Sequence, residues 1–318
     1  MDYILIIIGF VLLIFGANYL VDGSVGVAKR FNVPDLIIGL TIVAFGTSAP
    51  ELVVNLIASL DPKTTDIALT NIIGSNTINT FIILGATASV FPVKSQIDSR
   101  KFDIPTSLAA PLILLLLAWY FDREVSRADG VMLLAVFSFF MYITTRKALR
   151  MRTILKPKET KNTGKQKKPG LHCIMIIGGL VMLVTGGQLI VKSATTIAES
   201  LGISQAVIGL TIVALGTSLP ELATSVVAAM KKNSDIALGN ILGSNIFNVF
   251  FILGISSVVR PLPAYENMAA DLTIAALGSL LILIFVLTNK KYEIKRWEGF
   301  LLLCIYMVYL VWMISKAN

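Results

Sequence analysis

Two glutamates, Glu51 and Glu221, stand in the middle of otherwise apolar stretches and lie in copies of one short motif. Residues 39–52 read GLTIVAFGTSAPEL and residues 209–222 read GLTIVALGTSLPEL, so the copies are identical at 12 of 14 positions. No Lys or Arg occurs in the central part of any long apolar stretch. Because a carboxylate without a basic partner is costly in hydrocarbon, we expect both glutamates to bind mobile cations or protons.

Hydroxyl and carbonyl oxygens surround each glutamate in the sequence. Thr47 and Ser48 precede Glu51 by four and three residues and therefore share its helix face. Ala44 and Asn55 extend that face. The motif proline cannot donate a backbone hydrogen bond, so we expect it to kink the helix and to free carbonyl oxygens in the preceding turn.

A second repeated segment carries side-chain amides. Residues 66–85 and residues 235–254 are identical at 14 of 20 positions. Both copies hold an Asn–Ser–Asn series at intervals of four residues: Asn71, Ser75 and Asn79, then Asn240, Ser244 and Asn248. Carboxylate, hydroxyl, amide and carbonyl oxygens suit hard cations such as Ca²⁺ and Na⁺, whereas soft metals prefer Cys or His. We interpret Asp66 and Asp235, which open the two copies, as helix N-caps.

The composition is that of a polytopic membrane protein. Hydrophobic residues make up 55% and charged residues 14% of the chain, against about 25% charged residues in soluble domains. Lipid satisfies no backbone hydrogen bonds, so the spans must be helices of about 20 residues. The apolar runs predict an all-α protein with ten transmembrane helices: roughly 3–21, 36–60, 66–91, 104–121, 128–146, 171–191, 205–230, 235–259, 268–289 and 297–315.

The net charge of +8 comes largely from one polar segment and does not indicate nucleic-acid binding. Ten of the 27 Lys and Arg residues lie between Arg146 and Lys168. We interpret residues 147–170 as a basic cytoplasmic loop, with a regulatory or lipid-binding role as the alternative. With this loop inside, 21 of the 27 basic residues face inward, which places both termini outside.

The two halves of the chain repeat each other. Glu51 aligns with Glu221 at an offset of 170 residues, and residues 9–21 resemble residues 178–191 in the same register. Five spans per half is an odd number, so the second half enters the membrane from the opposite side and the halves are inverted repeats. Their motifs then meet at the bilayer midplane in one site. The predicted five-helix repeats are residues 1–146 and residues 171–318.

The charge of this site limits which cations it can carry. Two ionised carboxylates give a charge of −2, which one divalent cation neutralises, and monovalent cations can occupy the same oxygens instead. Mutual exclusion at one site is the simplest physical basis for antiport. We therefore expect a multi-pass antiporter of the plasma (inner) membrane, without a cofactor, whose partners are small inorganic cations and the lipid bilayer. Because one chain completes the site, we expect it to function as a monomer.

The motifs G-T-S-x-P-E and G-S-N-x-x-N, paired twice in this order, resemble those of the cation/calcium exchanger superfamily, specifically prokaryotic sodium/calcium exchangers. The resemblance covers nearly the whole chain. It implies that Ca²⁺ binds the two glutamates and the motif threonine carbonyls, that Na⁺ binds the motif serines and alanine carbonyls, and that the first and sixth spans slide during alternating access. The candidate ligands are then Glu51, Glu221, Thr47, Thr217, Ser48, Ser218, Ser75, Ser244, Asn79, Asn248, Ala44 and Ala214.

One departure from the family bears on the driving ion. Potassium-dependent and several microbial relatives carry Asp at the position of Asn248, whereas Asn79 and Asn248 are both neutral, and the G-N-x-x-E pattern of proton/calcium exchangers is absent. Na⁺/Ca²⁺ exchange is therefore favoured, with a proton-driven or K⁺-dependent antiporter as the alternative. A cation channel is more remote, because channels usually build filters at an oligomer axis. No enzyme is expected, since the single histidine, His172, has no copy in the first half.

Overall fold

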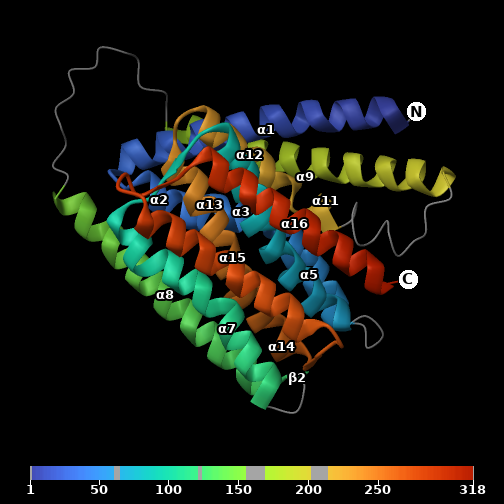
Figure 1. The fold of residues 1–318 in the computed structure, drawn as a ribbon. Coiled ribbons are helices and arrows are strands. Elements are labelled where there is room, and N and C mark those ends of the chain that lie inside the picture. Colours follow the sequence, from blue (N-terminus) through green and yellow to red (C-terminus); the bar gives the residue numbers. More distant parts are fainter. Residues whose placement is uncertain (1, 61–64, 121–123, 155–168, 202–213, 318) are drawn as a thin grey trace.

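The computed structural model describes residues 2–60, 65–120, 124–154, 169–201 and 214–317 (Figure 1). These residues are almost entirely helical, as an apolar chain in lipid requires. Their strands form two short antiparallel pairs. β1 (Val93–Lys94) pairs with β4 (Glu293–Ile294), and β2 (Glu124–Val125) pairs with β3 (Leu262–Pro263).

Several helices in each half are interrupted by breaks or by π-helical turns (η). The first half contains α1 (Asp2–Phe31), α2 (Asp35–Ile38), η1 (Gly39–Val43), α3 (Ala44–Thr47), α4 (Ala49–Leu60), α5 (Thr65–Ile78), η2 (Asn79–Ile83), α6 (Leu84–Val90), η3 (Ser99–Asp103), α7 (Ile104–Tyr120) and α8 (Arg127–Ile154). The second half contains α9 (Pro169–Ser200), α11 (Ala214–Thr217), α12 (Leu219–Met230), α13 (Ser234–Ile246), η5 (Phe247–Leu253), α14 (Gly254–Val259), α15 (Met268–Thr288) and α16 (Arg296–Ala317).

Among the described residues, seven helices are long and apolar enough to cross a membrane. An eighth span results if the bent pair Asp35–Thr47 and Ala49–Leu60 counts as one. Of the two other predicted spans, 104–121 corresponds to α7, which has 17 residues. The span predicted at 205–230 is described only from Ala214 onward, because residues 202–213 lie outside the described part of the chain.

Three helices run further than their apolar stretches predict. α1 has 30 residues and α9 has 32, so both extend well past the predicted spans. α8 continues to Ile154 and therefore covers the first part of the segment that we expected to be loop from residue 147. α8 keeps its helical hydrogen bonds beyond the apolar segment, where its polar residues can be solvated.

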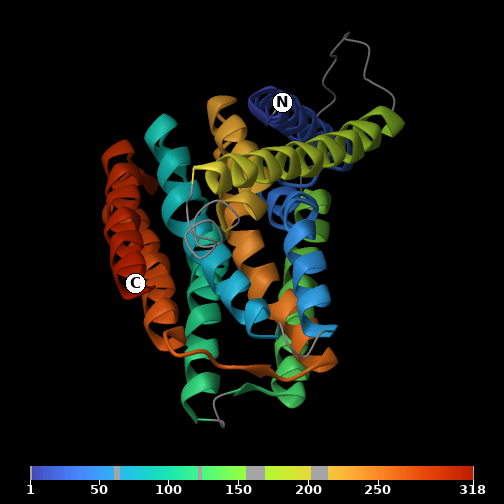
Figure 2. The ribbon, with the colours of Figure 1, turned by 90° about the vertical axis from the view of Figure 1, so that its right-hand side faces the viewer.

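α1 and α9 lie side by side, run antiparallel and cross the other helices at a steep angle (Figures 1 and 2). Glycines bring the two backbones together. A Cβ atom on Gly9 would lie 2.8 Å from the Gly186 carbonyl oxygen, and one on Gly16 would lie 2.8 Å from the Gly179 carbonyl oxygen. No real Cβ atom fits at such distances, so this close packing depends on glycine.

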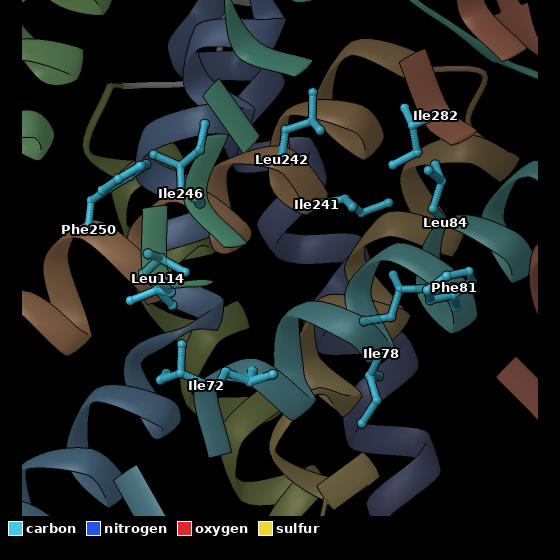
Figure 3. Packing of buried hydrophobic residues seen from close by; sticks show 14 of the residues in the cluster. Ile72, Ile78, Phe81, Leu84, Leu114, Ile241, Leu242, Ile246, Phe250 and Ile282 are labelled. Carbon is cyan, nitrogen blue, oxygen red and sulfur yellow. The ribbon is translucent and has the colours of Figure 1, made fainter. Parts of the chain in front are cut away.

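The core lies where α5, η2, α13 and η5 meet the flanking helices. Figure 3 shows Ile72 and Phe81 from the first half packed among Ile241, Leu242 and Phe250 from the second, and all five are essentially inaccessible. All residues from Ile236 to Ile246 in α13 are buried. Close side-chain packing of this kind holds helices together in lipid, where the hydrophobic effect between them is absent. The core therefore fixes the helices that carry the second repeated segment.

Candidate functional site

Both copies of the glutamate motif break a helix at their serine. Ser48 stands between α3 and α4 with φ −83° and ψ 7°, and Ser218 stands between α11 and α12 with φ −89° and ψ 2°. Pro50 and Pro220 follow two residues later and cannot donate to the carbonyl four residues before them. The first break bends the helix by 48°, which confirms the predicted kink.

Each glutamate lies in the first turn of the helix that follows the break. Glu51 in α4 and Glu221 in α12 are each 1% exposed. The peptide dipoles at a helix N-terminus favour negative charge, but by too little to offset complete burial of a carboxylate. In the described residues neither carboxylate forms a salt bridge. This pair therefore requires a cation or a proton from solution.

Hydrogen bonds between the two halves bring the motifs to one centre. Ser48 Oγ donates to Glu221 Oε1 at 3.0 Å, so a residue of the first motif touches the carboxylate of the second. Thr47 Oγ1 donates to Asn240 Oδ1 at 3.0 Å, and the Asn240 amide donates to the main-chain carbonyl of Glu221 at 3.4 Å. The two breaks are thus held against each other and against α13.

Hydroxyl groups complete the surroundings of both carboxylates. Thr217 lies beside the Glu51 carboxylate, and Ser244 lies beside the Glu221 carboxylate. Each of these hydroxyls is a neutral oxygen that can coordinate a hard cation.

The asparagines Asn79 and Asn248 lie in π-helical turns at equivalent positions. Asn79 is the first residue of η2, Asn248 is the second residue of η5, and each is 1% exposed. The Asn79 amide donates to Asn245 Oδ1 at 3.1 Å, and the Asn248 amide donates to Asn76 Oδ1 at 3.0 Å. π-Helical turns are rare and occur frequently at functional sites. Their presence here singles out the same two residues as the sequence pattern.

Buried oxygens without a hydrogen-bond partner concentrate in these motifs. Buried polar atoms are nearly always paired, so each exception needs a reason. Seven of the fourteen exceptions among the described residues come from predicted ligands: Glu51 Oε2, Glu221 Oε2, Thr217 Oγ1, Ser218 Oγ, Ser244 Oγ, Asn79 Oδ1 and Asn248 Oδ1. All seven are oxygens, as hard cations prefer. No cluster of three His, Cys, Asp or Glu residues occurs in the part of the chain described, so the donor set is two carboxylates with neutral oxygens.

A cavity of about 570 Å³ reaches the motifs from one side. Its walls are one stretch of α9, from Val184 to Lys192, the end of α11 at Thr217, and the starts of α4 and α12, including Pro50 and Pro220. On the α1 side the packing is closed. Buried residues of α1 pack in one apolar cluster with α12: Leu13, Ala17, Leu20 and Val21 against Ala228 and Ala229. In the part of the chain that the structure describes, the cavity thus lies along α9 and the close packing along α1.

Comparison with known proteins identifies the family. The family model described as sodium/calcium exchanger protein matches residues 1–146 and 171–315, which is nearly the whole chain. The chain belongs to the sodium/calcium exchanger family. The exchanger is 32% identical over 346 residues to the sodium/calcium exchanger MaX1 of Methanosarcina acetivorans, with 98% of this chain and 97% of MaX1 covered. It is 35% identical over 262 residues to the inner membrane protein YrbG of Escherichia coli, with 81% and 79% covered.

A solved structure agrees with these relatives. The sodium-calcium exchanger NCX_Mj superposes on this exchanger with a TM-score of 0.83 and 30% identity, and the match covers 98% of both chains. The exchanger is therefore a prokaryotic member of the cation/calcium exchanger superfamily. Members of this family are transporters and not enzymes.

Two predicted polar positions in the exchanger lie away from the centre. Asn71 Nδ2 donates to Asn55 Oδ1 at 2.8 Å, and Asn55 Nδ2 donates to the Ala68 carbonyl at 3.0 Å. These bonds join α4 to α5. Asn55 lies one turn after Glu51 in α4 and is buried like it, as expected, but its amide is used in packing α4 on α5.

The carbonyl of Ala44 is also not free. It accepts the Ser48 N–H at 3.0 Å. Pro50 instead leaves the Gly46 carbonyl, four residues before it, without its usual helical donor. Ala214 begins α11, and its side chain lies outside the described residues.

The remaining predictions concern Ser75 and the two helix starts. Ser75 is buried in α5. Asp235 is not an N-cap, since Asn233 caps α13 by accepting the Ile236 N–H at 3.1 Å, and Asp235 instead accepts a hydrogen bond from Gln96. The side chain of Asp66 lies outside the described residues.

Sequence reasoning missed two residues, Asn76 and Asn245. Both are buried and bond to the predicted ligands Asn248 and Asn79. The signal was present, because each is the first Asn of a G-S-N-x-x-N motif. The regular spacing of Asn71, Ser75 and Asn79 at four residues favoured Asn71 over Asn76 as the buried amide of the site.

Proposed function

We propose that this exchanger carries Ca²⁺ out against Na⁺, with both cations competing for the centre around Glu51 and Glu221. The observation that carries the proposal is a pair of fully buried carboxylates that has unpartnered oxygens and, in the described residues, no salt bridge. With both groups ionised the charge is −2, which one Ca²⁺ neutralises. Na⁺ ions can neutralise the same charge, so occupancy by one cation excludes the other.

The proposed ligands divide into two groups. Ca²⁺ uses Glu51 and Glu221 together with the main-chain carbonyls of Thr47 and Thr217. Na⁺ uses the motif hydroxyls, and the amide oxygens of the two π-helical asparagines supply neutral contacts: Ser48, Ser75, Ser218, Ser244, Asn79 and Asn248. The unpartnered oxygens support this assignment. The Ala44 carbonyl is a poorer candidate, because it already accepts the Ser48 N–H.

We infer that transport proceeds by alternating access. The cavity between α9 and the starts of α4 and α12 opens the centre to one side, while α1 packs closely on α12. In the opposite conformation α9 would pack closely on the motifs and α1 would move away from α12. The cavity along α9 would then be closed, and a route along α1 would be open. The α1–α9 pair is the element suited to this motion, because its glycines hold the two helices together as one unit that crosses the others steeply. NCX_Mj has been described in terms of extracellular ion exchange and binding-site occlusion, with Na⁺, Ca²⁺ and Sr²⁺.

The proposed topology has ten spans in two inverted repeats. Reciprocal glycine contacts support it. Gly9 contacts Gly186, and Gly16 contacts Gly179. At the offset of 170 residues Gly9 aligns with Gly179 and Gly16 with Gly186, so each contact is the repeat of the other. The described ends of α1 and α16 lie on one side of the molecule, and the end of α8 and the start of α9 lie on the other (Figure 1). With the basic loop in the cytoplasm, both termini are outside. YrbG is described as an inner membrane protein, and we propose the same location for this exchanger. A single chain is the proposed functional unit.

A proton-driven antiporter is the second candidate, because a buried carboxylate pair can also carry protons. Proteoliposomes separate the two. Uptake of labelled Ca²⁺ is measured after imposing an outward Na⁺ gradient, an outward K⁺ gradient or a pH gradient, one at a time. Uptake that follows only the Na⁺ gradient, and stops when an ionophore collapses it, is the expected result. Uptake that follows the pH gradient and ignores Na⁺ would establish the proton-driven alternative.

A further inference from the structure

We propose that Asn76 and Asn245 are positioning residues, which turn the side-chain oxygens of Asn248 and Asn79 toward the transported cations. This inference rests on the proposed function and adds residues that do not themselves touch the cations. Its basis is a buried ladder of amides between α5–η2 and α13–η5, in which each half orients an asparagine of the other.

The ladder is reciprocal. Asn79 Nδ2 donates to Asn245 Oδ1 at 3.1 Å, and Asn248 Nδ2 donates to Asn76 Oδ1 at 3.0 Å. Asn76 aligns with Asn245, and Asn79 with Asn248, at the offset of 169 that relates the second repeated segments. Two further bonds fix the supports, from Asn76 Nδ2 to the Asn245 carbonyl at 3.1 Å and from Asn245 Nδ2 to Thr80 Oγ1 at 3.0 Å.

The bond to the backbone sets the direction of one chain of amides. A main-chain carbonyl only accepts, so the nitrogen of Asn76 must face the Asn245 carbonyl. The Asn76 oxygen then faces Asn248, so Asn248 must donate a hydrogen bond to it from its side-chain nitrogen. The oxygen of Asn248 is left over, and it is buried without a partner.

Asn79 has a matching arrangement, since its nitrogen donates to Asn245 Oδ1 and its own Oδ1 is buried and unpartnered. Here the support is the Thr80 hydroxyl, which can donate or accept, so the direction is set less strictly than at Asn76. An amide turned over would present an NH₂ group to a cation instead of an oxygen. The two supports thereby determine whether Asn79 and Asn248 attract or repel the cargo. Neutral amides need such a device, whereas a carboxylate offers oxygen at both ends.

Direct Ca²⁺ binding to the purified exchanger, together with Na⁺-driven uptake, tests the inference. Asn76→Ala and Asn245→Ala are compared with Asn71→Ala, which removes a partly buried amide of the same helix that bonds to Asn55 of α4 and not to the ladder. We expect each ladder variant to raise the Ca²⁺ concentration for half-saturation about tenfold, and Asn71→Ala to change it less than about twofold. The thermal unfolding midpoint of each variant reports on folding, and Asn76→Ser replaces any alanine variant that does not fold.

A double substitution distinguishes positioning from general loosening. In a background of Asn248→Asp, both ends of the side chain are oxygens, so its orientation no longer matters. Adding Asn76→Ala to that background removes an acceptor that would face the new carboxylate, so it should not raise the half-saturating concentration. An equal loss with and without Asn248→Asp, or equal affinity of Asn76→Ala and Asn71→Ala, would overturn the inference. If the unsubstituted exchanger shows neither Ca²⁺ binding nor Na⁺-driven uptake, the proposed function fails instead.

Discussion

At the scale of single residues, the charge of Glu51 and Glu221 is the property that the site depends on. Glu51→Gln and Glu221→Gln keep the side-chain shape but remove one negative charge, so we expect Na⁺-driven Ca²⁺ uptake to be lost and Ca²⁺ binding to weaken at least about 100-fold, which is roughly 2.7 kcal/mol. Binding is measured on purified protein and uptake in proteoliposomes.

The matched control is Glu298→Gln. Glu298 is also buried at a helix start, where its carboxylate accepts the Lys295 N–H at 2.7 Å. Because an amide oxygen can accept the same bond, this variant should fold and transport nearly as the unsubstituted exchanger does. Near-normal uptake in either Glu51→Gln or Glu221→Gln would remove the carboxylate pair from the mechanism.

The sequence predicts these two glutamates because their chemistry conflicts with their surroundings. A carboxylate in an apolar run has no structural explanation, and its repetition points to one shared site. The amide ladder could not be predicted in this way. Whether Asn71 or Asn76 faces the other half depends on the rotation of α5 against α13, and Asn is common enough as a packing residue that type alone does not decide. The engaged carbonyl of Ala44 likewise depends on the local hydrogen bonds of the break.

At the scale of elements, the glycines between α1 and α9 make the clearest test. A Cβ atom on Gly179 would lie 2.7 Å from the Gly16 carbonyl oxygen, so Gly179→Ala must push the two helices apart. We expect it to lower stability by about 1–3 kcal/mol and to slow exchange. Gly178→Ala is the control, since a Cβ atom there has no heavy atom within 4 Å. It should leave exchange unchanged and raise stability by up to about 1 kcal/mol through helix propensity.

Thermal unfolding of the purified variants and their initial uptake rates provide the two readouts. Equal behaviour of Gly179→Ala and Gly178→Ala would show that the close contact of the backbones does not matter for transport. Slower exchange with unchanged stability would instead place the effect of Gly179 in the motion of the helix pair.

The elements could be predicted where apolar length decides them, and not where hydrogen bonding does. Long apolar runs predict α1, α9 and α15, and the proline predicts the break at Ser48. The π-helical turns at Asn79 and Asn248 add one residue to a helical turn, which leaves almost no trace in a periodic pattern. Helix ends such as that of α8 at Ile154 also escape, because polar residues continue a helix outside the apolar layer as readily as they form a loop.

At the scale of the whole molecule, the two sides of the exchanger differ although its halves carry the same motifs. The odd number of spans per half and the loop charges predict that the halves are inverted, but nothing in two matching copies indicates which side is open. The structure has its cavity along α9 and its closed packing along α1. An ion pair reinforces the closed side, since Lys231 at the end of α12 bonds Asp22 of α1 at 2.7 Å. It also donates to the Asn18 carbonyl at 3.3 Å.

We predict that Lys231→Gln shifts the exchanger away from this conformation. The ion pair is partly exposed, so its contribution is at most about 1 kcal/mol, equivalent to a change of about fivefold in the balance of the two conformations. A cysteine introduced as Gln188→Cys, on the α9 wall of the cavity, reports on that balance through its reaction rate with a water-soluble thiol reagent. Cys173 and Cys304 are exposed and are first replaced by serine. Labelling should be slower with Lys231→Gln, because the cavity is open for less of the time.

Lys232→Gln supplies the control, because it removes the same charge from the neighbouring exposed position. If the two lysine variants label at equal rates, the ion pair has no influence on which side is open, and the closed packing of α1 on α12 alone sets the balance. Exchanging the charges in Asp22→Lys with Lys231→Asp should restore the labelling rate, since it rebuilds the pair with its signs reversed. Recovery by that double variant would show that attraction between α1 and α12, rather than the positive charge itself, biases the exchanger toward the side lined by α9.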